Sequence, residues 1–327
     1  MSTCLFRSPL AERLSAFFEI RHALGRSVKS DYTLFRCIDR FLIKTLKPGQ
    51  PITRRVVAKW VKDIAPLSVG TRINRMCLFR QFCLYLNHFD PRTYLVHQSF
   101  LPRRVRPAPF IYTREQVQDI LAAARRIGPP DSLRPSVMAT LLGLLYATGL
   151  RVGEARKLTL ADVDLEEGVL HVRETKFKKS RDVPISVSTI KALSDFLCER
   201  QDAGFSTNPV APAFVNPAGK AYGQTQVYEL FMEIVRHLGI RGPKGERGPR
   251  MHDFRHTFAV HRLAAWYKEG ADLSVKLPLL TTYLGHTTVF CTEVYLQATA
   301  ELLEEAGKRF HRYSAIPFPG REERHGS

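Results

Sequence analysis

A proline- and arginine-rich stretch divides the chain. Residues 101–110 read LPRRVRPAPF, with three prolines and three arginines. Proline cannot extend a helix, and it pushes the residue before it into an extended conformation. The chain of 327 residues also exceeds the length of an average domain. We therefore expect a domain at residues 1–100, a linker at 101–110, a second domain at 111–313 and a loose polar tail at 314–327.

Positive charge is concentrated before and within this linker. Residues 1–110 contain 20 Lys and Arg against six Asp and Glu, whereas the rest of the chain has 29 against 25. Lys and Arg favour a polyanionic partner because they release the counterions condensed on phosphates. The positive charge of the first domain therefore predicts that its partner is a nucleic acid. The alternatives are a solubilising surface or affinity for anionic lipid, although no amphipathic lipid anchor is evident.

Hydrophobic spacing predicts four helices in the first domain. They cover about Pro9–Leu24, Ser30–Leu46, Thr53–Ile64 and Val69–Asn87. In the fourth helix three arginines lie largely outside the apolar face. A basic face opposite an apolar one is typical of a helix that binds DNA, although a charged face exposed to solvent is the more common explanation. We predict DNA contacts from these three and from the arginines of the linker, namely Arg72, Arg75, Arg80, Arg103, Arg104 and Arg106.

The second domain is predicted to combine helices with one hairpin. A capping-box sequence at residues 113–116 opens its first helix. Strands at 168–173 and 181–185 should form a hairpin around a lysine-rich turn. Further helices are expected near residues 136–147, from 152, near 188–201, 224–238 and 252–267, and on both sides of residues 285–288. The predicted fold is thus mainly helical, with a small β-hairpin or sheet.

Cysteine usage and hydropathy narrow the class of protein. Six scattered cysteines without a C-x-x-C pattern favour reduced thiols in a cytosolic protein over a disulfide framework or a zinc site. The start lacks the apolar stretch of a signal peptide. The longest apolar run, residues 137–150, is shorter than the ~20 residues that a membrane span needs. We expect a cytoplasmic, nucleoid-associated protein with no membrane partner.

Two of four candidate motifs present cations. In TGLRVGE, residues 148–154, a glycine turn places Arg151 at a helix start, and Glu154 lies one turn later, where it can hold the guanidinium. A surface salt bridge of little energetic value is the alternative. In the hairpin turn, Lys176, Lys178 and Lys179 either grip a phosphate or form a charged solvent loop.

The third motif is MHDFRHTF, residues 251–258. His252 and Arg255 lie three apart and share one helix face, so both can address one anion. His252 and His256 lie four apart, as in the H-E-x-x-H zinc motif. Asp253 replaces the glutamate of that motif, however, and the charge of Arg255 opposes a dication. We therefore predict no metal site.

The fourth motif is LGHTTVFCTEVY, which places Tyr295 nine residues after His286. Taken alone it is a helix end, a threonine cap and a core tyrosine. Together the motifs supply arginines, histidines and a lysine that suit a phosphodiester, whose transition state carries extra negative charge on its non-bridging oxygens. Tyrosine can attack phosphorus when a base and a cationic pocket stabilise its phenolate.

The order Arg, Lys, His-x-x-Arg, Gly-His, Tyr resembles the tyrosine recombinase (phage integrase) family over about residues 1–305. The resemblance assigns catalytic roles, in chain order, to Arg151, Lys176, His252, Arg255, His286 and the nucleophile Tyr295. Glu154 is the matching supporting acid. The hairpin turn lacks the glycines of many relatives, so Lys178 and Lys179 remain alternatives to Lys176 and are otherwise predicted DNA contacts.

The resemblance implies a site-specific DNA recombinase whose two domains form a C-shaped clamp on double-stranded DNA. Tyr295 would form a 3′-phosphotyrosyl link, and Lys176 would protonate the departing 5′-oxygen. No metal, ATP or other cofactor is implied. Four copies would act on two DNA sites in integration, excision or transposition, with companion recombinases or accessory DNA-binding proteins as further partners. A DNA-binding protein with a vestigial site, a type IB topoisomerase-like enzyme and a zinc hydrolase are the alternatives.

Overall fold

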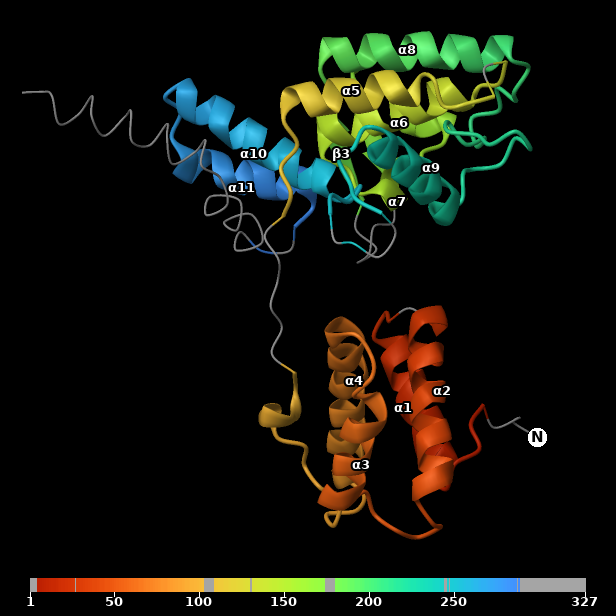
Figure 1. The fold of residues 1–327 in the computed structure, drawn as a ribbon, viewed down its shortest axis with the longest axis vertical. Coiled ribbons are helices and arrows are strands. Elements are labelled where there is room, and N and C mark those ends of the chain that lie inside the picture. The colour runs from red at the N-terminus through yellow and green to blue at the C-terminus, as the bar shows by residue number, and fades with distance from the viewer. Residues whose placement is uncertain are drawn as a thin grey trace, which may run out of the picture. The chain divides into compact units, whose positions relative to one another are not determined.

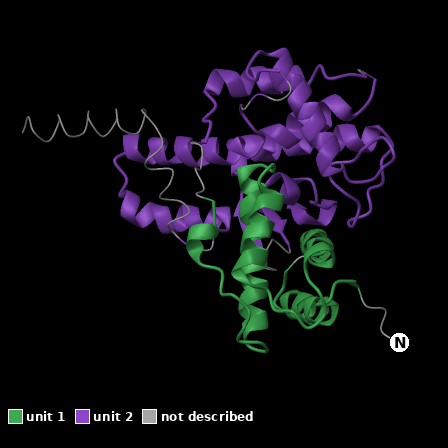
Figure 2. Ribbon diagram, turned by 60° about the horizontal axis from the view of Figure 1, so that its bottom comes forward, with its two compact units in different colours: residues 1–107 green, residues 108–327 purple. Residues whose placement is uncertain are grey.

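The computed structural model describes residues 5–26, 28–102, 109–129, 131–173, 180–243, 246, 248–286 and 288. The chain forms two compact units, residues 1–107 and 108–327 (Figure 2). The division falls within the proline-rich stretch. Each unit has its own hydrophobic core, and the second unit has an additional smaller one.

Unit 1 is a bundle of four helices, labelled in Figure 1. They are α1 (Ala11–Ala23), α2 (Val28–Thr45), α3 (Arg54–Ile64) and α4 (Val69–Asn87), followed by the 3-10 turn η1 (Gln98–Phe100). Aromatic rings dominate the core: Trp60 of α3 stacks on Phe79 of α4 with 5.2 Å between ring centroids, and Phe41 of α2 contacts both. The helices that the hydrophobic spacing predicted are confirmed.

Unit 2 packs helices around the apolar α6. Its helices are α5 (Arg114–Ala124), α6 (Arg134–Thr148), α7 (Val152–Ala155), α8 (Val187–Asp202), α9 (Gln224–His237), α10 (Asp253–Lys268) and α11 (Leu273–Leu284), with the 3-10 turn η2 (Leu160–Asp162). The capping box at the start of α5 is present, because Thr113 Oγ1 accepts from the Gln116 backbone N–H at 3.1 Å and the Gln116 side chain accepts in return. In the described part of the chain, no helix is long and apolar enough to cross a membrane.

A small antiparallel sheet lies beside α7. Its order is β1 (Val163–Asp164), β2 (Val169–Val172) and β3 (Arg181–Pro184). The predicted hairpin is confirmed, with Val172 opposite Arg181. The β1 strand was not predicted, because two residues are too short to show a strand periodicity. The structure is thus mainly helical with a small sheet, as the sequence predicted.

The last two described helices carry the third motif and the start of the fourth. Helices α10 and α11 enclose a small core that includes Phe258, Leu263 and Leu284. The helix expected after residue 288 lies outside the described residues. Two helix ends turn on glycines with left-handed backbones, Gly149 after α6 (φ 64°) and Gly285 after α11 (φ 67°), a conformation that residues with a Cβ rarely adopt.

Candidate active site

The carboxyl end of α11 gathers three arginines. The carbonyls of residues 283, 284 and 285 accept hydrogen bonds from Arg181 Nε at 3.0 Å, Arg255 Nη2 at 2.6 Å and Arg151 Nη2 at 3.4 Å, respectively. The last carbonyls of a helix lack partners within the helix and carry the negative end of its dipole, so guanidinium groups are favourable partners for them. The end of α11 therefore brings together side chains from α7, β3 and α10.

Arg255 is the most deeply buried of the three. Only 2% of its surface is exposed. Besides Leu284, its guanidinium binds the Gly149 carbonyl through Nη1 at 2.8 Å. Both acceptors belong to helix ends, so Arg255 joins the end of α6 to the end of α11. These bonds fix the plane of the guanidinium without neutralising its charge.

Arg151 stands at the start of α7 and is held by Glu154. Arg151 Nη1 donates to Glu154 Oε1 at 2.7 Å, and the Arg151 backbone N–H donates to Oε2 at 3.1 Å. Arg181 binds the same carboxylate through Nη2 at 2.9 Å. Burial acts to raise the pKa of Glu154, but the hydrogen bonds and charge of Arg181, together with the hydrogen bonds from Arg151, outweigh it and lower that pKa. Glu154 is therefore an ionised carboxylate shared by two arginines.

His286 follows directly on the glycine that ends α11. Its backbone N–H donates to the Thr281 carbonyl at 3.0 Å. Desolvation, followed by the charges of Arg255 and Arg151, lowers the pKa of its imidazole from 6.5 to about 3. A neutral imidazole thus stands among permanent positive charges, which is the electrostatic environment that suits an anion.

His252 and His256 lie at the start of α10. Their rings meet edge to face with centroids 5.0 Å apart. The His252 side chain reaches the surface, and its pKa is lowered by partial desolvation and by His256 and Arg255. Arg250 and the buried Asp253 brace this helix start, since Arg250 Nη2 donates to Asp253 Oδ1 at 2.9 Å.

The surroundings of the histidine pair bear on the zinc alternative. Among the described residues, no group of three or more His, Cys, Asp or Glu side chains is placed to hold a metal ion. Desolvation lowers the pKa of both histidines, and the charges of Arg255 and Arg250 lower it further; the same charges would repel a dication. The pair fits an anion better.

Several predicted residues lie outside the part of the chain that the structure describes. They are the linker arginines Arg103, Arg104 and Arg106, the turn lysines Lys176, Lys178 and Lys179, and the predicted nucleophile Tyr295.

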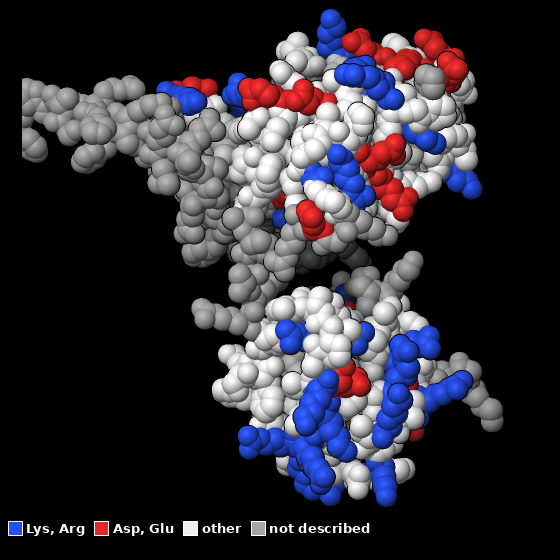
Figure 3. Space-filling model, viewed as in Figure 1, with Lys and Arg blue, Asp and Glu red and all other residues white. Residues whose placement is uncertain are grey.

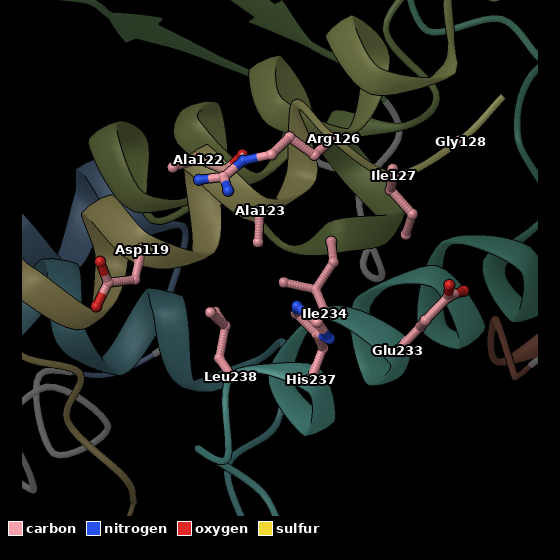
Figure 4. A pocket seen from close by; sticks show the side chains of 10 residues that line it. All are labelled: Asp119, Ala122, Ala123, Arg126, Ile127, Gly128, Glu233, Ile234, His237 and Leu238. Carbon is pink, nitrogen blue, oxygen red and sulfur yellow. The ribbon is translucent and has the colours of Figure 1, made fainter. Parts of the chain in front are cut away.

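A pocket of about 310 Å³ lies between α5 and α9 and is lined by residues that include Asp119, Arg126, Glu233 and His237 (Figure 4). None of the predicted site residues lines this pocket.

Unit 1 presents a second gathering of cations. A pocket of about 590 Å³ is bounded by residues of α2, α3 and α4, among them Arg40, Lys44, Lys59, Lys62 and Arg75. On the face of unit 1 shown in Figure 3, basic side chains predominate and acidic ones are sparse. The structure shows the surroundings of two of the α4 arginines that were predicted to contact DNA. Arg75 lines this pocket, whereas Arg80 binds the Val96 carbonyl through Nε at 3.0 Å and secures the segment after α4.

Comparison with known proteins decides the family. The phage integrase family matches residues 111–301 of this chain. A Sinorhizobium fredii protein, provisionally named integrase/recombinase y4rB, is 34% identical over 309 residues, which cover 93% of this chain and 98% of that protein. The chain belongs to the phage integrase family. The tyrosine recombinase XerD of Halalkalibacterium halodurans is 27% identical to this phage integrase family member over 273 residues, covering 81% of this chain and 84% of XerD.

Solved structures of tyrosine recombinases share the fold of this phage integrase family protein. The Tn1549 transposon integrase in complex with transposon right-end DNA superposes with a TM-score of 0.68 at 17% identity, covering 94% of this chain and all of that one. XerH bound to its palindromic difH substrate, in a post-cleavage complex, gives 0.63 at 21% identity, covering 87% and 80%. The predicted recognition as a tyrosine recombinase is confirmed, and with it the function of a DNA recombinase or integrase.

Sequence reasoning missed Arg181. The sequence patterns indicated no role for it beyond the start of a predicted strand, yet the structure places its guanidinium against both Glu154 and the end of α11. The available signal was an arginine at the start of a strand that flanks a predicted active-site turn. That signal gives the position of Arg181 in the chain but does not indicate which groups its side chain contacts.

Proposed function

We propose that this protein cleaves and rejoins DNA through a 3′-phosphotyrosyl intermediate formed by Tyr295. The observation that supports this most is the convergence of Arg151, Arg255 and His286 at the end of α11. Tyr295 follows His286 by nine residues. A nucleophile that close in the chain to an anion site suits attack on a phosphate held there.

The two arginines bind the non-bridging oxygens of the scissile phosphate. Arginine is suited to this because its charge is permanent and its planar fork of donors matches phosphate geometry. Both guanidinium groups are oriented by carbonyl or carboxylate partners before DNA arrives. Preorganised charge of this kind stabilises the transition state without reorganisation during the reaction.

The histidines act as neutral hydrogen-bonding groups. The pKa of His286 is lowered to about 3, so at neutral pH its imidazole donates a hydrogen bond to the phosphate and adds no charge. His252, exposed at the start of α10, assists proton transfer from the Tyr295 hydroxyl. A bound phosphate monoanion raises the pKa of both groups, because it opposes the arginine charges.

The strand is cut when the Tyr295 oxygen attacks phosphorus and the bond to the 5′-oxygen breaks. Lys176 donates the proton that the departing 5′-oxygen takes up. A 5′-hydroxyl from the partner strand then attacks the phosphotyrosine and releases Tyr295. The phosphotyrosyl link conserves the energy of the phosphodiester, so rejoining needs neither ATP nor a metal ion.

The cationic pocket of unit 1 binds the DNA backbone. Its five cations come from three helices, and only one acidic side chain, Asp63, lies on the same pocket among the described residues. Phosphate contacts of this type position a protein on duplex DNA and make its affinity depend on salt. We propose that the two units hold double-stranded DNA together, with the linker arginines and the turn lysines adding contacts.

Recombination requires more than one copy of the chain, because each copy supplies one Tyr295 and each exchange cuts several strands. We propose four copies on two DNA sites, working in the cytoplasm on integration, excision or transposition. A λ integrase tetramer has been solved on a Holliday junction, and it shares the fold with a TM-score of 0.61 at 14% identity. Companion recombinases or accessory DNA-binding proteins are further candidate partners.

The proposal is tested with nicked suicide DNA that carries the ends of the genetic element encoding the protein. The wild type should form a covalent protein–DNA adduct on denaturing gels. The Tyr295→Phe variant should form none, whereas Tyr85→Phe, a control in the aromatic core of unit 1, should retain it. An undiminished adduct with Tyr295→Phe would refute the nucleophile. No adduct with the wild type would favour a DNA-binding protein with a vestigial site.

A further inference from the structure

All three nitrogens of the Arg181 guanidinium donate hydrogen bonds to other groups of the protein. Its Nε donates to the Tyr283 carbonyl at 3.0 Å, and its Nη1 and Nη2 donate to Glu154 at 3.4 and 2.9 Å. Only 12% of the side chain is exposed. With all three nitrogens engaged, this arginine is placed to orient other groups rather than to bind a ligand itself.

The partners of Arg181 are the groups that hold the candidate active site. Glu154 is also the carboxylate that holds Arg151. The end of α11 carries His286, and a Cβ added to Gly285 would lie 3.0 Å from Arg181 Nη1. Arg181 itself starts β3, directly after the hairpin turn with the predicted catalytic lysine. Arg181 thus connects the hairpin to Glu154, which holds Arg151, and to the end of α11, which carries His286.

The charge balance gives Arg181 a second effect. A carboxylate bound to Arg151 alone would cancel the charge of that arginine. Because Glu154 is shared, the three groups together keep one positive charge beside the site. Arg181 therefore lets Glu154 orient Arg151 without neutralising it. This matters at an anion site, where charge attraction in a partly desolvated environment is strong.

We propose that Arg181, anchored by the Tyr283 carbonyl, is a positioning residue of the strand-cleavage reaction: through Glu154 it aims Arg151 and preserves its charge. The inference rests on the proposed function above. It concerns the step in which the scissile phosphate gains negative charge.

The test compares two suicide substrates at saturating DNA, one with an ordinary scissile phosphate and one with a methylphosphonate there. The methylphosphonate has one negatively charged oxygen fewer, so it depends less on Arg151. We expect Arg181→Met to slow adduct formation on the phosphate by about 10- to 100-fold, the scale of a misplaced catalytic group. On the methylphosphonate the loss should be several-fold smaller, and DNA affinity should change little.

Arg200→Met is the matched control. Arg200 is a buried arginine of α8 that likewise donates to backbone carbonyls, those of Ser206 at 2.8 Å and Pro212 at 3.1 Å, and none of the site residues that the structure describes is among these partners. Its loss should lower the melting temperature and leave the ratio of the two cleavage rates at the wild-type value. Arg181→Lys, which keeps the charge but loses the fork, should fall between wild type and Arg181→Met. It also replaces Arg181→Met if that variant does not fold.

A double variant separates positioning from direct contact. If Arg181 acts through Glu154, then Arg181→Met combined with Glu154→Gln should cleave no more slowly than the slower single variant. Multiplied losses would overturn the proposal, because they would mean that Arg181 acts on the phosphate independently. An equal loss on both substrates would also overturn it and leave a purely structural role. These outcomes require a cleaving wild type, so they are distinct from failure of the proposed function itself.

Discussion

Arg255 donates a hydrogen bond of 2.8 Å to the carbonyl of Gly149, which lies 106 positions earlier in the chain. The glycine ends α6 just before Arg151, so one contact fixes the spacing between the two predicted catalytic arginines. Phe258 of α10 also lies against this glycine. The phosphate site therefore depends on a backbone conformation as much as on its charged side chains.

Gly149→Ala should be strongly destabilising. The left-handed backbone at Gly149 costs a residue with a Cβ roughly 1–2 kcal/mol, and the added Cβ would lie 2.6 Å from Phe258 Cδ1 and 2.9 Å from Leu284 Cδ2. Relief of this overlap should cost about 1–3 kcal/mol more. Gly204→Ala is the control, because its φ of 78° is similar and nothing lies within 4 Å. Urea unfolding measures both; equal losses would show that the close contact at Gly149 is unimportant.

Stability should fall as the pH drops below about 6.5, in part because of His286. Its pKa in the folded protein is about 3, against an ordinary value of 6.5. Between these values the unfolded chain takes up a proton that the folded chain does not, so acid favours unfolding and the stability returns above pH 6.5. In His286→Gln, the free energy of unfolding should depend less on pH between 7 and 5. Identical pH dependence in the two proteins would contradict the burial of a neutral imidazole here.

The cations of unit 1 should govern the salt dependence of DNA binding. Lys59→Ala or Lys62→Ala should weaken binding to any duplex sequence, and each should reduce the slope of log affinity against log salt by about 0.9 for each phosphate that the variant no longer neutralises. Arg92→Ala is the control, since Arg92 is already paired with Asp90 at 2.9 Å. Fluorescence anisotropy at several salt concentrations measures the slopes. Unchanged slopes in both lysine variants would place the DNA elsewhere on unit 1.

Chelation should leave strand cleavage intact. Arg250 and Arg255 place positive charge beside the histidine pair at the start of α10, so we expect adduct formation to proceed at an unchanged rate in EDTA. Loss of activity that added Zn²⁺ restores would instead support a zinc site at His252 and His256. The suicide-substrate assay serves here as well, and Tyr295→Phe in the same buffer sets its background.

Local patterns predicted the helices and the hairpin because each depends on neighbours in the chain. The capping box at Thr113 and the two glycines that end helices are signals spanning four residues or fewer. The order of the motifs also predicted the family and named Arg151, Arg255 and His286 for one site. Their roles remain proposals. Residues 176 and 295 lie outside the described part of the chain.

By itself, then, the sequence determined the helices and the hairpin, the family and the residues suited to phosphate chemistry. Only the tertiary structure decided how those residues are held. Arg181 reaches Tyr283 across 102 positions of chain, and Arg151 reaches Gly285 across 134. Such pairings arise when packed helices bring unsatisfied carbonyls to buried guanidinium groups, and no local periodicity encodes that meeting. Three arginines meet at the end of α11 because its last carbonyls have no hydrogen-bond partners within the helix and the arginines donate to them.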